Sequence, residues 1–354
     1  MNRILLINPG STSTKVAVYE DSAPLMEDTL RHTSEELEAW GSIPDQKPYR
    51  KALIEQTLQK AGIGLHTLSA AVGRGGMVRP IESGTYEIND KMLEDLNGPG
   101  AASHASSLGG LIAHEFGAQL GIPAYVVDPI VVDELEPVAK LSGLAGIERR
   151  SIFHALNTKS VLRKVARSLG MPYEDGRFIA VHMGGGITVS AHRYGRVIDV
   201  NSALDGDGAF TPDRTGSLPL LPVIEMCYSG EYTKEEMVDK VQRKGGLHSY
   251  LNTNNMIEAS EMVKQGDEFA ALVVDSMAYQ ICKEIGAMFA VLEGRVNAIV
   301  LTGGIAYDQR FTALIKKRVD MLCPVITHAG ENEMEALAEG ALRVLEGLEK
   351  PSVY

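Results

Sequence analysis

Short apolar runs separated by a polar segment predict a β-hairpin at the beginning of the chain. Residues 4–7 read Ile-Leu-Leu-Ile and residues 16–19 read Val-Ala-Val-Tyr, and both runs suit buried strands. Residues 8–15 between them read Asn-Pro-Gly-Ser-Thr-Ser-Thr-Lys. Gly10 lets the backbone approach a ligand, and its neighbours offer the N–H and O–H donors that a phosphate needs. An ordinary polar turn is the alternative interpretation.

The same pattern of strand, glycine-rich turn and strand recurs in the second half of the chain. The apolar run 178–183 is interrupted by Gly184-Gly185-Gly186 and resumes at 187–191. Three glycines exceed what reversing the chain requires, although a tight connection without a ligand remains the alternative. Two similar hairpins far apart in the sequence indicate a duplicated domain.

Elsewhere the pattern alternates short apolar runs with helical stretches, which is typical of α/β proteins. Residues 298–304 form a third run that ends in two glycines, and a helix is predicted after it at about 308–322. Other helices are predicted after Ser151 as N-cap, from Asp267 to Leu292, and over 334–348, where apolar residues recur at helical spacing. Within that last helix Gly340 permits a close approach to another element.

Composition narrows the function classes. The chain of 354 residues is long enough for two or three domains, and 44% hydrophobic and 23% charged residues are ordinary for a globular protein. A net charge of -12 argues against nucleic acid as a partner. The three cysteines, Cys227, Cys282 and Cys323, are scattered, so we expect a reduced, cytoplasmic protein. No apolar run approaches the ~18 residues of a membrane span, and we expect no membrane partner. The first apolar run, 4–7, is too short for a signal peptide.

Motifs for other phosphate or metal chemistries are missing from the sequence. It contains no Gly-x-x-x-x-Gly-Lys-Ser/Thr segment, no His-Glu-x-x-His and no cysteine pair with zinc spacing. Phosphoryl transfer needs cations, loop amides and Mg²⁺ rather than a protein nucleophile. The glycine-rich turns and nearby arginines fit that chemistry.

Several of these segments resemble the acetate and butyrate kinase family, within the superfamily of sugar kinases, actin and actin-like ATPases. Residues 8–15 resemble its first phosphate loop, residues 182–186 its second, and Thr302-Gly303-Gly304-Ile305 its adenosine loop. Residues 214–217 (Arg-Thr-Gly-Ser) and the region around Arg74 resemble its two arginine sites. The matches cover nearly the whole chain. The resemblance implies two duplicated actin-like (ribonuclease H-like) α/β domains with a ligand cleft between them.

The expected domains are residues 1–148, completed by a returning helix at 337–354, and residues 149–336, which carry the nucleotide loops. The resemblance also implies roles for individual residues. The implied catalytic residues are Arg74, Asp128, His154 and Arg214. Arg74 and His104 are implied to bind the substrate. The implied ATP-binding residues are Ser11, Ser13, Lys15, His182, Gly184, Gly185, Gly186, Gly303, Gly304 and Ile305. Asn8 and Glu333 are implied to hold Mg²⁺, mostly through water.

Each of these residues has a structural alternative. Arg74 suits a carboxylate because its planar fork can bind one bidentately. The alternatives are a surface arginine in a glycine loop and an exchange of roles with nearby Arg79. Arg214 would neutralise charge on the phosphoryl group, or it would pair with Asp213 or Asp207. The histidines and Asp128 could be structural, and Glu333 could simply favour a helix N-terminus.

The resulting hypothesis is an ATP-dependent kinase that converts butyrate or isobutyrate to an acyl phosphate and ADP, reversibly and by direct transfer. The wording of residues 8–15 and the shorter chain resemble butyrate kinase more than acetate kinase. Two departures from the acetate kinase pattern are an arginine-free stretch at 254–257 and His104-Ala105-Ser106 in place of His-Asn-Pro. A sugar or polyol kinase and an actin-like ATPase are the alternatives. A homodimer or higher homo-oligomer is expected.

Overall fold

The computed structural model describes residues 1–98, 100 and 104–354. Contacts within the chain divide these residues into two compact units. The first unit comprises residues 1–132 and 332–354, and the second comprises residues 133–331.

These bounds differ from the expected boundaries at 148/149 and 336/337 chiefly over residues 133–148. That segment contacts the second unit, because the N–H of Glu136 donates to the carbonyl of Ile198. The stretch around Glu136 therefore extends an edge of the second unit.

The first unit is built on a sheet of six strands within the described residues. They are β1 (Arg3–Pro9), β2 (Ser13–Glu20), β3 (Ala23–Arg31), β4 (Ala70–Gly73), β5 (Thr85–Glu87) and β6 (Ala124–Val127). Their order is β3-β2-β1-β4-β6-β5. β1 to β3 form an antiparallel meander, and β4 and β6 run parallel to β1. The hairpin predicted at the beginning of the chain is confirmed, with Ile7 paired to Val16.

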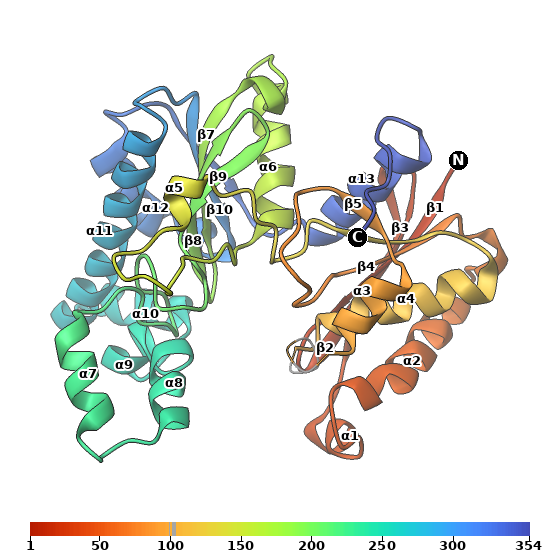
Figure 1. Cartoon of the computed structure of the whole chain (residues 1–354), viewed down its shortest axis with the longest axis horizontal. Coiled ribbons are helices and arrows are strands. Elements are labelled where there is room, and N and C mark those ends of the chain that lie inside the picture. Colours follow the sequence, from red (N-terminus) through yellow and green to blue (C-terminus); the bar gives the residue numbers. More distant parts are fainter. Residues whose placement is uncertain (99, 101–103) are drawn as a thin grey trace. The chain divides into compact units, whose positions relative to one another are not determined.

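Helices cover both faces of this sheet (Figure 1). They are α1 (Ser34–Glu38), α2 (Lys47–Lys60), α3 (Asp90–Leu96), α4 (Ser107–Leu120) and α13 (Glu333–Leu345), with short 3-10 helices at Pro44–Gln46 and Leu65–Thr67. Leu5 and Ile7 pack in one apolar cluster with Leu108 of α4. Because side chains alternate along a strand, Ile4 and Leu6 face the other side, where α13 contacts β1, β4 and β6.

The second unit, all of whose residues are described, is built on a five-stranded sheet. Its strands are β7 (Arg177–Met183), β8 (Ile187–Arg193), β9 (Arg196–Val200), β10 (Ala298–Gly303) and β11 (Val325–Ala329). Their order is β11-β10-β7-β8-β9. The second predicted hairpin is confirmed, since β7 and β8 are antiparallel with Met183 paired to Ile187.

Helices also cover both faces of the second sheet (Figure 1). They are α5 (Pro137–Lys140), α6 (Ala155–Ser168), α7 (Leu220–Tyr228), α8 (Lys234–Gln242), α9 (Gly246–Leu251), α10 (Met256–Lys264), α11 (Glu268–Val291) and α12 (Gln309–Val319), with 3-10 helices at Tyr173–Asp175 and Gly304–Tyr307. Residues of α11 and α12 pack with Ile179 and Val181 of β7. Residues of α6 pack on the opposite face with Phe178 and Ala180.

The two sheets share one plan, which confirms the predicted duplication of an α/β domain. In each sheet the strand that comes first in sequence, β1 or β7, begins a three-stranded antiparallel meander on one side and has two parallel strands on the other. The first unit adds β5 at the edge beside β6. The turns after β1 and after β7 are therefore equivalent positions, and both are the glycine-containing turns singled out in the sequence.

Among the predicted helices, α6 begins later than expected. Its N-cap residue is His154 and not Ser151. The cause is the preceding segment, where the carbonyl of Ile152 accepts a hydrogen bond of 2.8 Å from the N–H of Ala203 and keeps the chain out of the helix. His154 is thereby fixed at the start of α6.

The predictions for the other long helices are confirmed. Asp267 caps α11, and its side chain accepts from the N–H of Ala270. The close approach predicted for Gly340 is present in α13, because an added Cβ would lie 2.5 Å from Cγ1 of Val127 on β6. Among the helices of the described chain, none combines the length and apolar character needed to cross a membrane.

Candidate functional site

The first unit carries the predicted phosphate loop at the turn between β1 and β2. The N–H of Gly10 donates to the carbonyl of Ser13 over 2.7 Å, which closes the turn. The side chains of Ser11 and Lys15 are exposed, and Ser13 is half-buried. Lys15 is the register partner of Asn8 on the neighbouring strand. The predicted donors therefore gather around one turn.

A buried arginine that sequence analysis missed holds this loop. Arg50 of α2 is 0% exposed. Its guanidinium donates to the carbonyls of Gly10 at 2.8 Å, Ser13 at 3.1 Å and Ser11 at 3.1 Å. Burial lowers the pKa of Arg50 below its ordinary value. Because carbonyl oxygens repel phosphate, a cation that draws them inward leaves the loop better suited to an anion.

Three predicted residues of the first unit meet directly. Glu333, in the first turn of α13, binds Nη1 of Arg74 through Oε1. Its other oxygen, Oε2, accepts from Nδ2 of Asn8 over 2.6 Å. The side chains of Arg74 and Glu333 are 15% and 12% exposed. The predicted carboxylate-binding arginine and the two predicted Mg²⁺ residues thus form one cluster.

Arg79, the alternative to Arg74, is engaged elsewhere. It is exposed, and its Nε and Nη2 bind the carboxylate of Asp95 at 2.6 and 2.9 Å. Hydrogen bonding from Arg79, helped by Tyr354, lowers the pKa of Asp95 to about 2. This bidentate pair occupies the fork that a substrate carboxylate would need.

Asp128 and His104 differ in how firmly they are held. Asp128 follows β6 in a left-handed conformation with φ 37°, which is uncommon for a residue other than glycine. Its Oδ1 accepts from the hydroxyl of Ser83 at 2.6 Å and from the N–H of Gly84 at 2.8 Å. His104 is exposed just before α4. The contacts of Asp128 tie down the segment around Ser83.

The second unit carries Gly184-Gly185-Gly186 at the turn between β7 and β8. The nearest atom to a Cβ added at Gly185 would be Oδ2 of Asp213 at 3.8 Å, so open space lies before this residue. A Cβ added at Gly186 would overlap Nη1 of Arg214. The hydroxyl of Thr211 donates to the carbonyl of Gly185 over 2.7 Å and holds the loop.

Two predicted histidines stack beside this loop. The ring centroids of His154 and His182 lie 3.7 Å apart, and their planes differ by 8°. Nδ1 of His154 lies 3.1 Å from the hydroxyl oxygen of Thr188. Nδ1 of His182 lies 2.9 Å from Nδ2 of Asn157, which the sequence did not single out. The start of α6, which carries His154, and the end of β7, which carries His182, therefore bring the two imidazoles together.

The other ring nitrogen of His182 is buried but makes no hydrogen bond within the described structure. Oε1 of Glu331 lies 3.2 Å from this Nε2, which is close enough for an ion pair although the angle is wrong for a hydrogen bond. Hydrogen bonds weaken steeply when misaligned, so this contact does not satisfy Nε2. A Cβ added at Gly184 would lie 3.5 Å from the same nitrogen. His182 Nε2 thus faces the glycine turn.

Arg214 lies on the same side of the loop as His154. Its Nη1 donates to the carbonyl of Ala203 over 2.9 Å, and its buried Nε makes no hydrogen bond to any described residue. Nε lies 3.8 Å from Oδ1 of Asp213, so the alternative ion pair exists but is long. Burial raises the pKa of Asp213 above its ordinary value, and Arg214 partly offsets this. The guanidinium retains donor capacity toward the loop.

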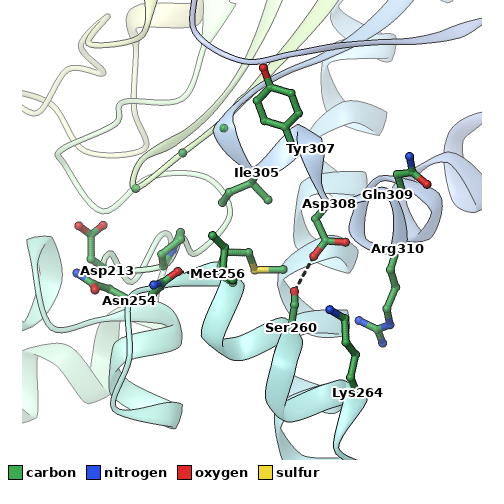
Figure 2. A pocket seen from close by; sticks show the side chains of 16 residues that line it. Asp213, Asn254, Met256, Ser260, Lys264, Ile305, Tyr307, Asp308, Gln309 and Arg310 are labelled. Atoms are coloured by element: carbon green, nitrogen blue, oxygen red, sulfur yellow. Dashed lines mark hydrogen bonds between the residues drawn. The ribbon is translucent and has the colours of Figure 1, made fainter. Parts of the chain in front are cut away.

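A cavity of about 970 Å³ opens from the glycine turn (Figure 2). Gly184, Gly185 and Asp213 line one part of it, and the arginine-free stretch 254–257 lines another. Ile305, Tyr307, Asp308 and Arg310 come from the segment that follows β10, and Ser260, Lys264 and Gln309 complete the labelled side chains. The hydroxyl of Ser260 donates to Asp308 over 2.5 Å inside the cavity. The volume lies in the range of small-molecule sites.

The predicted adenosine loop forms part of this cavity. Gly304 and Ile305 line it directly. Gly303 has φ 88°, and a Cβ there would lie 2.4 Å from the carbonyl oxygen of Met183 on the neighbouring strand. Only glycine fits this close crossing of the two chains. Gly303 therefore positions Gly304 and Ile305.

The structure thus brings the predicted residues into two groups, one in each unit. The first unit holds Asn8, Ser11, Ser13, Lys15, Arg74, His104, Asp128 and Glu333, of which Asn8, Arg74 and Glu333 are in contact. The second unit holds His154, His182, Gly184, Gly185, Gly186, Arg214, Gly303, Gly304 and Ile305. Met256 is buried and also lines the cavity. Asn157 and Arg50 were missed, since neither belongs to a local motif.

A duplicated α/β fold with glycine-containing turns at equivalent strand ends is the actin-like, two-domain fold. Solved structures agree with this fold. An acetate kinase from Porphyromonas gingivalis matches with a TM-score of 0.81 at 18% identity, over 98% of this chain and 100% of that chain. A propionate kinase from Francisella tularensis matches with a TM-score of 0.78 at 18% identity, over 96% of this chain and 99% of that chain.

An acetate kinase from Entamoeba histolytica also matches, with a TM-score of 0.76 at 17% identity, over 96% of this chain and 98% of that chain. A family model described as the acetokinase family matches residues 136–332, more than half of the chain. The chain belongs to the acetokinase family.

Proposed function

We propose that this protein is an ATP-dependent kinase of short-chain carboxylic acids, with butyrate or isobutyrate as substrate. The observation that carries the proposal is the cluster of His154, His182 and Arg214 around the glycine turn, in a chain of the acetokinase family. Two histidine hydrogen-bond donors and an arginine cation around this turn suit phosphoryl transfer, which relies on positioning and charge neutralisation.

The proposed reaction is a direct in-line transfer. A carboxylate oxygen of the acid attacks the γ-phosphorus of ATP, the bond to the bridging oxygen breaks, and ADP leaves with the electron pair. The acid is already ionised at neutral pH and needs little general-base help. Arg74 would orient the carboxylate, and Arg214, His154 and His182 would donate to the phosphoryl oxygens. The reverse reaction makes ATP from the acyl phosphate.

The cavity beside Gly185 is proposed to hold the nucleotide. Gly184 and Gly185 would present backbone N–H groups to its phosphates, and Ser11, Ser13 and Lys15 are also proposed as phosphate donors. Because Asn254-Asn255-Met256-Ile257 lacks an arginine, contacts to the base would come from Met256, Ile305 and neighbouring residues of the cavity.

Mg²⁺ is the proposed cofactor, and Asn8 and Glu333 are the proposed residues that hold it. Nδ2 of Asn8 donates to Oε2 of Glu333 over 2.6 Å, so the two side chains lie together, and the amide oxygen with a carboxylate oxygen would suit an ion that keeps most of its waters. Over the described residues there is no cluster of three or more His, Cys, Asp or Glu side chains that would form an all-protein cage. When bound, Mg²⁺ would neutralise charge on the phosphates.

Butyrate is preferred to acetate in this proposal because of the sequence. The first phosphate loop reads Asn-Pro-Gly-Ser-Thr-Ser-Thr-Lys, and His104-Ala105-Ser106 replaces the bulkier His-Asn-Pro. Smaller side chains there would leave room for a longer acyl tail.

Two other functions make different predictions for one assay. A sugar or polyol kinase would release ADP with glycerol, and Asp128 would be its base. An actin-like ATPase would release ADP slowly without an acceptor. Measuring ADP release with butyrate, with glycerol and with neither separates all three functions, and we expect release to depend on butyrate.

The acid preference is tested by a chain-length series. Each methylene buried in an apolar pocket contributes roughly 0.8 kcal/mol, so kcat/KM should rise from acetate through propionate to butyrate or isobutyrate. Longer acids should react poorly, because overfilling a packed site costs about 1–3 kcal/mol. Acyl phosphate formation is the measurement. A maximum at acetate would refute the butyrate assignment alone, and activity only with polyols would refute the carboxylate kinase as well.

We also propose a homodimer or higher homo-oligomer in a cytoplasmic setting. No residue of α7 is buried, and Leu220, Leu221 and Tyr228 are 70%, 73% and 87% exposed. Monomeric proteins rarely expose so apolar a helix, so a second copy of the chain is the proposed partner.

The cysteines Cys227, Cys282 and Cys323 are free, which supports the proposed reducing, cytoplasmic compartment.

A further inference from the structure

A buried side chain on α6 contacts the imidazole of His182 from the side opposite the glycine turn. Asn157, His182 and Thr302 are 2%, 1% and 0% exposed. His182 and Thr302 are register partners on the parallel strands β7 and β10. Asn157 reaches both from α6. In this dry interior Oδ1 of Asn157 and Nε2 of His182 are left without a hydrogen-bond partner within the described structure, and unmatched buried polar groups are costly.

The carbonyl of Gly330 decides which groups donate and which accept in this cluster. The hydroxyl of Thr302 donates to the carbonyl of Gly330 over 3.2 Å. With its proton committed, Thr302 Oγ1 accepts from Nδ2 of Asn157 at 3.3 Å. The same NH₂ group has a second proton, and Nδ1 of His182 lies 2.9 Å away. Nδ1 is therefore the acceptor in that contact.

An imidazole that accepts at Nδ1 carries its proton on Nε2 when neutral. Nε2 of His182 faces the glycine turn and makes no hydrogen bond in the described structure. Oε1 of Glu331 lies 3.2 Å from Nε2 but is misaligned for a hydrogen bond. A buried N–H directed at the turn is matched to an incoming phosphoryl oxygen.

We propose that Asn157 is a positioning residue that fixes His182 as the Nε2–H tautomer, so that a neutral imidazole donates to the transferred phosphoryl group. This inference rests on the proposed phosphoryl transfer. It explains how His182 donates without being charged, which matters because His154 stacks on it at 3.7 Å and two stacked imidazolium rings would repel. Reversing the Asn157 amide would instead put the proton on Nδ1 and make Nε2 an acceptor.

The tautomer can be measured without any substrate. Nitrogen-15 NMR of histidine-labelled protein distinguishes a protonated from an unprotonated ring nitrogen, and His182→Gln identifies the signal. We expect a neutral His182 with its proton on Nε2 in the wild-type protein. A proton on Nδ1 would overturn the proposal, whatever the protein's substrate proves to be.

Two substitutions test the consequence for turnover. Leucine has nearly the same size as asparagine and cannot form the hydrogen bond. Asn157→Leu should lower kcat by roughly 10- to 100-fold, by analogy with the loss of hydrogen-bond partners of metal-ligating histidines, with little change in KM. In a His182→Gln background the same substitution should have almost no further effect, because both changes remove one interaction. Equal losses in both backgrounds would mean that Asn157 acts only on folding.

Asn157→Asp adds a readout that packing alone would not move. A carboxylate at Nδ1 would attract the proton of the neutral ring, so Nε2 could donate only when the imidazole is charged. The kcat of this variant should fall as pH rises through the imidazole pKa, whereas the wild-type kcat should lack that decline. His154 and Glu331 face the same ring, so His154→Gln and Glu331→Gln are run as controls. An unchanged pH profile in Asn157→Asp would overturn the proposal.

Discussion

Gly185 is the residue at which nucleotide binding can be tested with least disturbance to the fold. A Cβ added there meets no protein atom closer than 3.8 Å, so Gly185→Val should fold normally. The side chain would instead occupy space in the proposed phosphate site. Overfilling such a site costs about 1–3 kcal/mol, so ATP affinity measured by calorimetry should fall roughly tenfold or more.

The matched control is Gly143→Val, because Gly143 has nothing within 4 Å and lies outside the cavity. Its nucleotide affinity should equal that of the wild type. If Gly185→Val binds ATP as well as the control does, the three glycines are only a turn.

The two proposed arginines should separate in steady-state kinetics. Arg214→Ala should lower kcat by ~10³-fold, by analogy with arginine fingers, because its contact strengthens as charge shifts during transfer. Arg74→Ala should mainly raise the KM for the acid. Arg79→Ala is the control, since Arg79 is exposed and paired with Asp95. Near-normal turnover in both Arg214→Ala and Arg74→Ala would refute the assignment, and a raised KM in Arg79→Ala alone would exchange the two roles.

Residues with a local motif were predictable from the sequence, and residues that act through tertiary contacts were not. The glycines of 184–186 are recognisable in the sequence because a hairpin turn does not require three glycines. Arg50 lies 40 positions from the carbonyl of Gly10 that it binds, inside a helix with no unusual composition. Asn157 reads as one polar residue of an amphipathic helix. Only packing reveals what either side chain touches.

At the scale of elements, α7 carries the prediction about assembly. Val223, Ile224 and Tyr228 of α7, together with residues of α8, line a cavity of about 660 Å³, and Leu220 and Leu221 of the same helix are exposed outside that lining. If a second copy covers this helix, Leu221→Glu should place a charge in the interface and shift the protein to a smaller species. Sedimentation or light scattering at micromolar concentration measures the mass.

Leu169→Glu is the matched control for α7, since Leu169 is 45% exposed at the end of α6. It should leave the mass unchanged. A wild-type protein that is monomeric at every concentration tested would refute the proposed role of α7.

Helix type was easier to predict than helix start. For α11, the long apolar run predicts a helix, and Asp267 before it predicts where the helix starts. The start is predictable because Asp267 caps the helix through a contact with nearby Ala270. The start of α6 depends on the contact between Ile152 and Ala203, which no local pattern contains. The same tertiary contact places His154 where the site needs it.

At the scale of the whole molecule, duplication was visible in the sequence because each hairpin pairs neighbours along the chain. The order of the remaining strands was not visible. β5 precedes β6 in sequence but lies outside it at the sheet edge, and the antiparallel pairing of Thr85 with Val127 is nonlocal. The membership of residues 133–148 likewise depends on contacts with Ile198 and Lys159.

The first unit is discontinuous, and this has a consequence for its synthesis. The second face of its sheet is covered by α13, with Gly340 against Val127 and its carbonyl bound by the hydroxyl of Thr85. A ribosome adding ~5–20 residues per second must make the whole second unit before it reaches α13. For tens of seconds at most, β1, β4 and β6 await their covering helix, while residues 133–331 can already fold. The second unit is therefore expected to finish folding before the first. The exposed face of the first unit's sheet would need protection until α13 has been synthesised.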